Sequence, residues 1–351
     1  VVLGFTAILL AGAFFFVRIN PACRQNLAVH HAQYQELAEA LSEGKVSVGD
    51  AEEALLAMKN PYDTIALQAA GIGYRADYAY HNGKYYVYFG IVPVLLLYLP
   101  YYLLTGGALQ NYVAVFVFFA GFIIAAAGFV YELMKRYFKE QPFYLWAVGT
   151  GMLVGSYSMF YLLIRPDLYH VPIAASTMFA TGGLWLYLAG LNRPKKAVGL
   201  YAFGSFCMAL TAGCRPQFIL FAALAVVLFW ERVFVKRELF SKKGWRQTAA
   251  LVVPYVLIAA GLMAYNALRF GSPFDFGASY SMTSNDMTHR GTNLERILYG
   301  IWYFLFEPMQ LEGKFPYLQS ASIATDYLGK LVTESWFGGI FACSMLTWGI
   351  F

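Results

Sequence analysis

Long apolar segments constrain this chain more than any other feature. Seven runs alternate with polar stretches, at 1–17, 110–131, 143–164, 171–190, 197–213, 217–235 and 247–268. A helix needs about 20 apolar residues to cross the hydrocarbon core of a bilayer. Only 13% of the 351 residues are charged and 59% are hydrophobic, whereas a soluble domain carries about 25% charged residues. We therefore expect an all-α bundle of transmembrane helices.

Two weaker apolar stretches bring the expected number of membrane segments to about 8 or 9. One begins near Phe337 and is cut off by the end of the sequence. The other, 89–104, is short and carries Pro93 and Pro100. Because the sequence lacks an initial Met and ends inside an apolar run, we expect residues 1–351 to be a fragment forming one transmembrane domain.

The basic residues predict the orientation of the helices. They gather in three loops, at Lys135, Arg136 and Lys139, at Arg193, Lys195 and Lys196, and at Arg232, Lys236, Arg237, Lys242, Lys243 and Arg246. The two loops between them carry one basic residue each, Arg165 and Arg215. Since Lys and Arg are enriched in cytoplasmic loops, the three basic loops should face the cytoplasm. This pattern is typical of a multi-pass protein of the cell membrane.

The segment 89–104 conflicts with this alternation if it crosses the membrane. Residues 18–85 and the basic loop at 133–142 fall on opposite sides only when an odd number of helices separates them. We predict that 89–104 is re-entrant or interfacial, with its non-helical turns shielded by protein. The alternative is that 89–104 crosses and one loop breaks the charge rule.

Two polar regions should then form the outer face, a first outer loop at 18–88 and a second at 269–296. In the first loop, 32–43 has apolar residues at helical spacing, and a second short helix ends at Asn60-Pro61. These helices could lie on the bilayer surface or be ordinary loop helices. The apolar stretch 297–309 predicts an interfacial helix or half-helix.

Acidic, basic and aromatic residues concentrate near the end of the first outer loop. The dipeptide Asn82-Gly83 predicts a tight turn beside the segment 89–104. A carboxylate here could act as a general base on a hydroxyl or hold a divalent cation. The alternative is that each residue is a solvated loop residue. The candidates are Asp77 and Asp63 as catalytic acids, with Lys84, Tyr85 and His81 as substrate ligands.

Arginines near the outer ends of the helices are candidates for binding phosphate. A guanidinium binds phosphate bidentately, and charge at membrane depth is costly unless it serves a function. The candidates are Arg215, Arg165, Arg269 and Arg290. Each has a structural alternative: Arg215 could reach the lipid headgroups, Arg165 could pair with Asp167, and Arg269 and Arg290 could belong to a folded loop.

The sequence argues against several other classes of site. The four cysteines, Cys23, Cys207, Cys214 and Cys343, form no CxxC or Cys/His pattern, so we predict neither a disulfide framework nor a metal site built on cysteine. The sequence identifies no metal-ligating residue, and the one cofactor that it suggests is a divalent cation held by a carboxylate of the outer loop. The net charge of +5 is modest and gives no support to nucleic-acid binding.

Two motifs give the chain a family resemblance. The stretch from Asn82 to Pro93 reads NGKYYVYFGIVP, and the stretch from Tyr265 to Phe274 reads YNALRFGSPF. Together with a first helix and a long outer loop, they resemble bacterial polytopic glycosyltransferases of the GT-C class, in an uncharacterised subgroup. The resemblance extends over most of the chain.

This resemblance implies a GT-C-like fold in the bacterial plasma membrane. It also implies transfer of a sugar from a polyprenyl-phosphate carrier to an acceptor on the outer face, with an acid in the first outer loop as catalyst. Residues 18–35 contain no Asp or Glu. The role therefore falls to Asp63 or Asp77, and we prefer Asp77. Lys84, Arg215 and Arg290 are the candidates for the carrier phosphate.

Two other classes remain open, a transporter or lipid flippase and a non-catalytic membrane protein. Transporters usually carry ionisable residues near the middle of the membrane, whereas the long segments here are nearly free of charge. The clustering of charge on the outer face favours a reaction at the interface. The enzyme hypothesis requires that the loop after Tyr265 lie on the same side of the membrane as Asp77.

Overall fold

The computed structural model describes residues 2–24, 32–156, 159–242, 244–283, 286–289, 294–314, 317–319, 321–327, 330–336 and 338–343. The chain divides into two compact units, Val1–Asn285 and Asp286–Phe351, and each is considered by itself. Helix is the predominant structure, in agreement with the prediction from the apolar segments.

Six helices of the described chain are long and apolar enough to cross a membrane. They are α1 (Val2–Ile19), α7 (Asn111–Tyr137), α10 (His170–Asn192), α11 (Ala197–Cys214, extended back to Pro194 by a 3-10 turn), the span Pro216–Val235 and α13 (Trp245–Phe270). The span Pro216–Val235 consists of a 3-10 segment at Pro216–Ala222, α12 (Ala223–Trp230) and a π-helical end at Glu231–Val235. All six coincide with predicted apolar segments.

The seventh predicted segment, 143–164, forms two shorter helices. They are α8 (Tyr144–Ser156) and α9 (Met159–Ile164). The prediction of 8 or 9 membrane segments therefore exceeds the six long spans found among the described residues.

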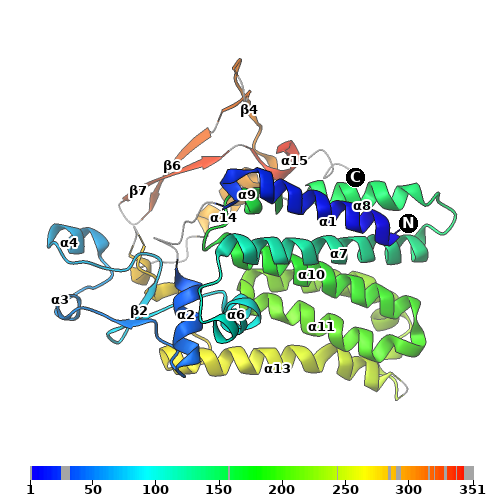
Figure 1. Cartoon of the computed structure of the whole chain (residues 1–351), viewed down its shortest axis with the longest axis horizontal. Coiled ribbons are helices and arrows are strands. Elements are labelled where there is room, and N and C mark those ends of the chain that lie inside the picture. Colours follow the sequence, from blue (N-terminus) through cyan, green and yellow to red (C-terminus); the bar gives the residue numbers. More distant parts are fainter. Residues whose placement is uncertain are drawn as a thin grey trace. The chain divides into compact units, whose positions relative to one another are not determined.

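The long helices lie side by side, with α10 between α7 and α11 and with α13 against α11 (Figure 1). Small residues allow this close packing, because a helix backbone can approach a neighbour most nearly where the side chain is smallest. A Cβ added to Gly190 would lie 2.4 Å from the ring of Tyr201, and one added to Gly204 would lie 2.9 Å from Tyr187. Glycine at these positions therefore makes room for the two buried tyrosines.

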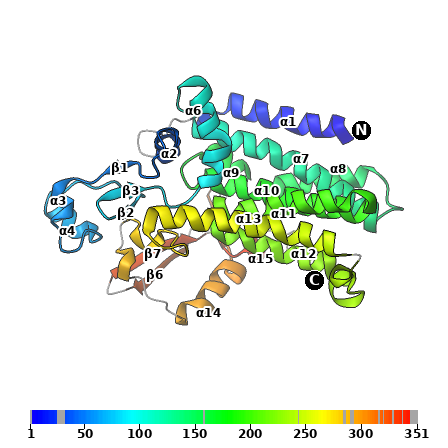
Figure 2. The same cartoon turned by 90° about the horizontal axis from the view of Figure 1, so that it is seen from below.

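The bundle has two chemically different ends. The end formed by 132–144, 192–197, 231–242 and 244–246 carries the three predicted basic loops, and we call it the basic end. The predicted basic residue Lys243 lies outside the described residues. The opposite end carries 33–110, 165–169 and 271–283, and we call it the loop end (Figures 1 and 2). Consecutive long helices from α7 to α13 run between these ends, as the alternation of basic residues predicted.

The segment that was predicted not to cross, 89–104, lies at the loop end. It forms α5 (Ile91–Pro93), a π-helical turn at Val94–Tyr98 and α6 (Leu99–Thr105). Figure 2 shows α6 lying across the end of α1 and α7. Both α1 and α7 meet this end, so the intervening chain does not run along the bundle. This arrangement supports the re-entrant or interfacial prediction.

Helix α2 (Gln33–Ser42) packs against this segment through its buried face. The rings of Tyr34 and Tyr98 pack with centroids 5.5 Å apart. The Tyr98 hydroxyl donates to Oδ1 of Asn111 at 2.7 Å, and Nε2 of Gln35 donates to the same oxygen at 3.0 Å. Because Asn111 begins α7, these bonds connect α2 and the short helix to the first turn of a long one.

The rest of the first outer loop combines short helices with a small sheet. The helices are α3 (Glu53–Leu56) and α4 (Thr64–Ala69), and the strands are β1 (Gly49–Asp50), β2 (Ala79–His81) and β3 (Lys84–Tyr86) in the antiparallel order β1-β3-β2. Asn82 and Gly83 both have positive φ, at 49° and 77°, as a two-residue hairpin turn requires. The predicted turn is confirmed, but the strands and α4 were not predicted.

The described part of the second unit contains short helices and strands. One helix comprises α14 (Glu295–Ile301) and a π-helical turn at Trp302–Phe306, and it ends before Glu307-Pro308 as the sequence suggested. The strands pair as two hairpins, β4 (Gln310–Leu311) with β5 (Leu318–Gln319) and β6 (Ala321–Tyr327) with β7 (Lys330–Trp336). A short helix, α15 (Ile340–Cys343), follows, and the remainder of the predicted terminal apolar segment lies outside the described residues.

Candidate functional site

Asp77 is hydrogen-bonded to residues of other segments at the loop end. Its Oδ1 accepts a hydrogen bond of 2.5 Å from the hydroxyl of Tyr169. The two residues are far apart in sequence, and Tyr169 lies in the turn just before α10. Asp77 also has a φ of 61°, a left-handed conformation that is uncommon for a residue other than glycine. The backbone and the side chain are thus both fixed by tertiary contacts.

The loop after Tyr265 meets Asp77 through its backbone. The amide of Asp77 donates to the carbonyl of Met282, and the amide of Met282 donates to the carbonyl of Tyr78, both at 2.9 Å. The Thr64 hydroxyl donates to the carbonyl of Thr283 at 3.0 Å. The two outer loops therefore lie on the same side of the bundle, which is the condition that the enzyme hypothesis had to meet.

Tyr88 is a partly buried tyrosine that is influenced by the charges of both Asp77 and Arg215. Burial raises the pKa of its hydroxyl, the negative charge of Asp77 raises it further, and the positive charge of Arg215 lowers it. The pKa of Tyr169 is raised first by burial and then by its hydrogen bond to Asp77. Both phenols therefore keep their proton at physiological pH, and that of Tyr169 donates to the carboxylate of Asp77.

Arg215 provides positive charge at this end of the bundle. It lies between α11 and the span Pro216–Val235, in an extended conformation with φ of −151° and ψ of 112°. Its side chain is partly exposed, and its guanidinium has no hydrogen bond or ion pair to any residue that the structure describes. A cation without a protein partner is available to an anionic ligand.

The turn that carries Tyr169 is itself fixed by a buried aspartate. Oδ1 of Asp167 lies 2.5 Å from Nδ1 of His170 and accepts from the backbone amide of Tyr169 at 3.0 Å. Arg165 lies nearby, with its Nε 3.5 Å from Oδ2 of the same carboxylate. Burial alone raises the pKa of Asp167, but these partners together lower it below its ordinary value, with His170 contributing most.

The second predicted acid, Asp63, has a local structural role. Its carboxylate accepts from the backbone amide of Ala66 at 3.2 Å and caps the N-terminus of α4. An acidic side chain at this position satisfies one of the free amides of the first helical turn. Between the two predicted acids, Asp77 is therefore the one that faces residues from other loops.

Sequence reasoning overlooked Glu36, which is the first residue after the acid-free stretch 18–35. Its carboxylate pairs with Arg75 and accepts from the hydroxyl of Tyr78 at 2.8 Å. The guanidinium of Arg75 stacks over the ring of Tyr78, 3.9 Å from its centroid. The position of Glu36 in the first turn of α2 offered no sign of this partner, because Arg75 follows 39 residues later.

The predicted substrate ligands of the β2–β3 hairpin point in different directions. Lys84 is exposed and borders a cavity of about 370 Å³ with Glu36, Glu43 and Asp50. Tyr85 is buried, and its ring packs 5.9 Å from that of Tyr80. The ring of His81 lies 4.6 Å from that of Tyr280. No contact joins any of the three to Asp77 in the described part of the chain.

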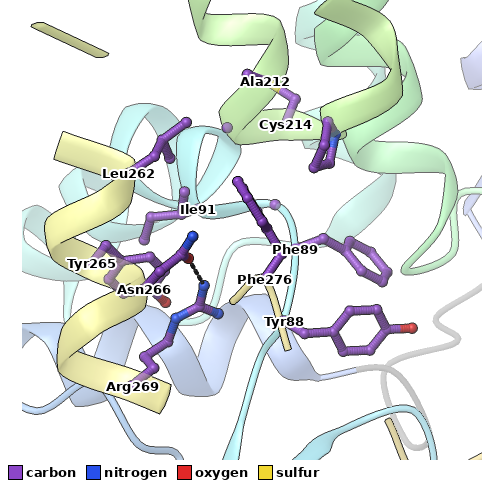
Figure 3. A pocket seen from close by; sticks show the side chains of 13 residues that line it. Tyr88, Phe89, Ile91, Ala212, Cys214, Leu262, Tyr265, Asn266, Arg269 and Phe276 are labelled. Carbon is purple, nitrogen blue, oxygen red and sulfur yellow. Dashed lines mark hydrogen bonds between the residues drawn. The ribbon is translucent and has the colours of Figure 1, made fainter. Parts of the chain in front are cut away.

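Arg269 connects α13 to the first outer loop. Only 4% of the residue is exposed. Its Nη1 donates to the carbonyl of Val87 at 2.6 Å. Its Nη2 donates to Oδ1 of Asn266 at 2.7 Å (Figure 3). The adjoining cavity has a volume of only about 20 Å³, which holds a single water. These contacts fix the loop, and the phosphate role stays a prediction. Arg290 lies outside the described residues.

The described residues bear on two expectations, the absence of a metal site and of a disulfide framework. Among the described residues, no group of three or more His, Cys, Asp or Glu is arranged to hold a metal ion. Cys23, Cys207, Cys214 and Cys343 are all free, and the first three are buried.

Six apolar spans with basic loops at one end define a multi-pass helical membrane protein. No family model, no curated protein and no solved structure matches the chain.

Proposed function

We propose that this protein is an integral-membrane glycosyltransferase of the bacterial plasma membrane. It would transfer a sugar from a polyprenyl-phosphate carrier to a hydroxyl of an acceptor at the loop end. One observation carries the proposal: the carboxylate of Asp77 is held by the hydroxyl of Tyr169 at the same end of the bundle as Arg215, whose guanidinium has no partner among the described residues. A base and a phosphate ligand are therefore available at one end of the bundle.

Asp77 is the proposed general base. The acceptor oxygen attacks the anomeric carbon of the sugar and its proton passes to the Asp77 carboxylate, while the bond from that carbon to the phosphate oxygen breaks. The hydrogen bond from Tyr169 holds the carboxylate in one orientation. A positioned base contributes about 10² to 10⁴ in rate.

Arg215 is the proposed ligand of the leaving phosphate. Negative charge on the phosphate grows as its bond to the sugar breaks, so a fixed cation stabilises the transition state more than the ground state. If a divalent cation takes part, it would add to this effect.

The surface beside Arg215 suits the tail of the carrier. The span Pro216–Val235 begins directly after Arg215, and only 6% of it is buried. Its exposed side chains include Leu220, Leu224 and Val227. A polyprenyl chain can lie along this apolar face in the bilayer while its phosphate reaches the guanidinium at the end of the helix.

The test uses the full chain reconstituted in lipid nanodiscs with a panel of labelled polyprenyl-phosphate sugars. Asp77→Asn should lower transfer about 100-fold or more, as expected for loss of a general base. Asp63→Asn is the matched control and should retain activity, because an asparagine also caps a helix. Arg215→Gln should weaken binding of polyprenyl phosphate, and Arg215→Lys should recover part of it.

Three outcomes would contradict the proposal. Full activity of Asp77→Asn would remove this residue as the base. Passage of the labelled lipid across a proteoliposome membrane without a covalent product would favour the flippase or transporter class. Absence of both polyprenyl-phosphate binding and transfer would favour a non-catalytic membrane protein.

A further inference from the structure

A basic cavity lies at the end of the bundle opposite to Asp77. It has a volume of about 350 Å³ and is lined by Lys135, Arg136, Tyr137, Lys139 and Asn192. Three of these five residues are cations and none is a carboxylate. A second cavity of about 250 Å³ is also lined by Arg136, so this arginine borders both hollows.

The guanidinium of Arg136 is poorly satisfied by the protein. Its Nη1 has two partners, the carbonyl of Leu191 at 3.4 Å and Oδ1 of Asn192 at 3.5 Å, and both bonds are long. Its Nε is buried without a hydrogen-bond partner. No carboxylate of the described chain lies within 4.0 Å of it. A buried donor that lacks a partner is costly, so this geometry suits an external acceptor.

The nearest acid along the helix is already committed elsewhere. Glu132 lies one turn before Arg136 on α7, and its Oε1 binds Nη2 of Arg193 at 2.5 Å while its Oε2 binds Nδ2 of Asn192 at 2.8 Å. The carboxylate therefore neutralises Arg193 rather than Arg136. The positive charge of the cavity is left without an internal counter-ion on this helix.

We propose that this cavity binds the phosphate of an anionic lipid headgroup. The ends of apolar helices lie at the depth of the headgroups, and basic pockets between helices are suited to anionic lipids. The planar guanidinium of Arg136 can bind two phosphate oxygens at once, while Lys135 and Lys139 supply further charge. The site is separate from the proposed transfer site and independent of it.

Binding is measured on the purified full chain by native mass spectrometry with phosphatidylglycerol, and with neutral phosphatidylcholine as the reference lipid. Arg136→Gln and the double variant Lys135→Gln, Lys139→Gln should each weaken retention of phosphatidylglycerol by about tenfold or more, since each basic residue near the headgroups contributes to attraction. Arg136→Lys should recover only part of the loss, because lysine keeps the positive charge but cannot bind two phosphate oxygens at once as the planar guanidinium does.

The matched control is Lys195→Gln, Lys196→Gln, which removes two charges from the same end of the bundle. Both lysines are exposed and neither lines the cavity of Lys135 and Lys139. Equal losses in the two double variants would overturn the proposal, because they would show that the whole basic surface attracts lipid. Displacement of the lipid by inorganic phosphate at equal concentration would identify free phosphate as the ligand and overturn the lipid assignment.

Discussion

The ion pair of Glu132 and Arg193 at the basic end has one buried and one partly exposed partner, and we predict that losing the partly exposed partner costs more stability than losing the buried one. The side chain of Glu132 is 3% exposed, whereas that of Arg193 is 38% exposed. When one partner is removed, the charge of the other stays either buried or in contact with water. Arg193→Gln leaves a buried carboxylate without its cation, and breaking a buried pair in this way costs about 3 to 5 kcal/mol.

The reverse substitution should cost less. In Glu132→Gln the remaining arginine can reach water, and the amide oxygen of the glutamine still accepts a hydrogen bond, so the loss is about 1 kcal/mol. Since Asn192 keeps one bond to Glu132 in the Arg193 variant, we take the lower limit of about 3 kcal/mol there. The difference of about 2 kcal/mol corresponds to roughly 30-fold in the unfolding equilibrium.

The free energies are measured by unfolding the purified protein in mixed dodecyl maltoside and SDS micelles, followed by circular dichroism. The double variant Glu132→Gln, Arg193→Gln should be no less stable than Arg193→Gln alone, because neither partner is then left charged. Lys195→Gln is the control in the same loop and should change stability by at most about 0.5 kcal/mol. Equal or greater loss in Glu132→Gln than in Arg193→Gln would refute the reasoning from burial.

Three further predictions concern the loop end. Since the pKa of Asp167 is lowered below 3.8 in the folded protein, its ionised form stabilises the fold above that pH, and the effect is lost as pH falls through the folded pKa. Asp167→Asn should therefore lower thermal stability by about 1 to 2 kcal/mol at neutral pH, and this loss should shrink as the pH falls below the ordinary pKa of an aspartate. A loss that stays the same from neutral to acidic pH would contradict this. Gly90 has φ of 81° and lies against Tyr34, so that an added Cβ would be 2.6 Å from the Tyr34 ring. Gly90→Ala should therefore lower the free energy of unfolding by about 3 kcal/mol. The control Gly106→Ala should lower it by only about 1 kcal/mol, because Gly106 has φ of 66° but open space around it. In a Cys343→Ser background, cysteines that replace Lys84 and Thr105 should react with a membrane-impermeant maleimide added on one side of the membrane. A cysteine that replaces Lys139 should react only when the reagent is added on the other side. Labelling of positions 84 and 105 from opposite sides would show that 89–104 crosses the membrane.

The long helices could be predicted because their physical cause is local. An apolar run such as 110–131 cannot remain in water and satisfies its backbone in lipid only as a helix, so the run itself indicates α7. The turn at Asn82-Gly83 was predictable for a similar reason, because asparagine and glycine adopt positive φ with little strain. The π-helical turn at Val94–Tyr98 was not predictable, because the segment containing Pro93 and Pro100 forms one continuous helix, Ile91–Thr105, that packs against α2.

The contacts of the candidate site could not be predicted, because they join distant parts of the chain. The Asp77–Tyr169 hydrogen bond spans 92 positions, and the bond from Thr64 to Thr283 spans 219. Composition placed acids and tyrosines in the right region, but only the fold separates Asp63, which caps its own helix, from Asp77, which receives Tyr169. The unpredicted strand β2 matters here, because it brings the backbone of Ala79 alongside Ser281.

The uneven burial of the long helices affects how freely their sequences can change. Between 56% and 61% of α7, α10 and α11 is buried inside the protein, whereas α13 and the span Pro216–Val235 are each only 6% buried. Most positions on the latter two helices need only be compatible with lipid, so exchanges such as Leu257→Ile should leave the fold intact. The fold therefore depends mainly on three neighbouring helices, and the sequences of the three sparsely buried spans, α1 (11% buried) among them, can diverge while the architecture persists.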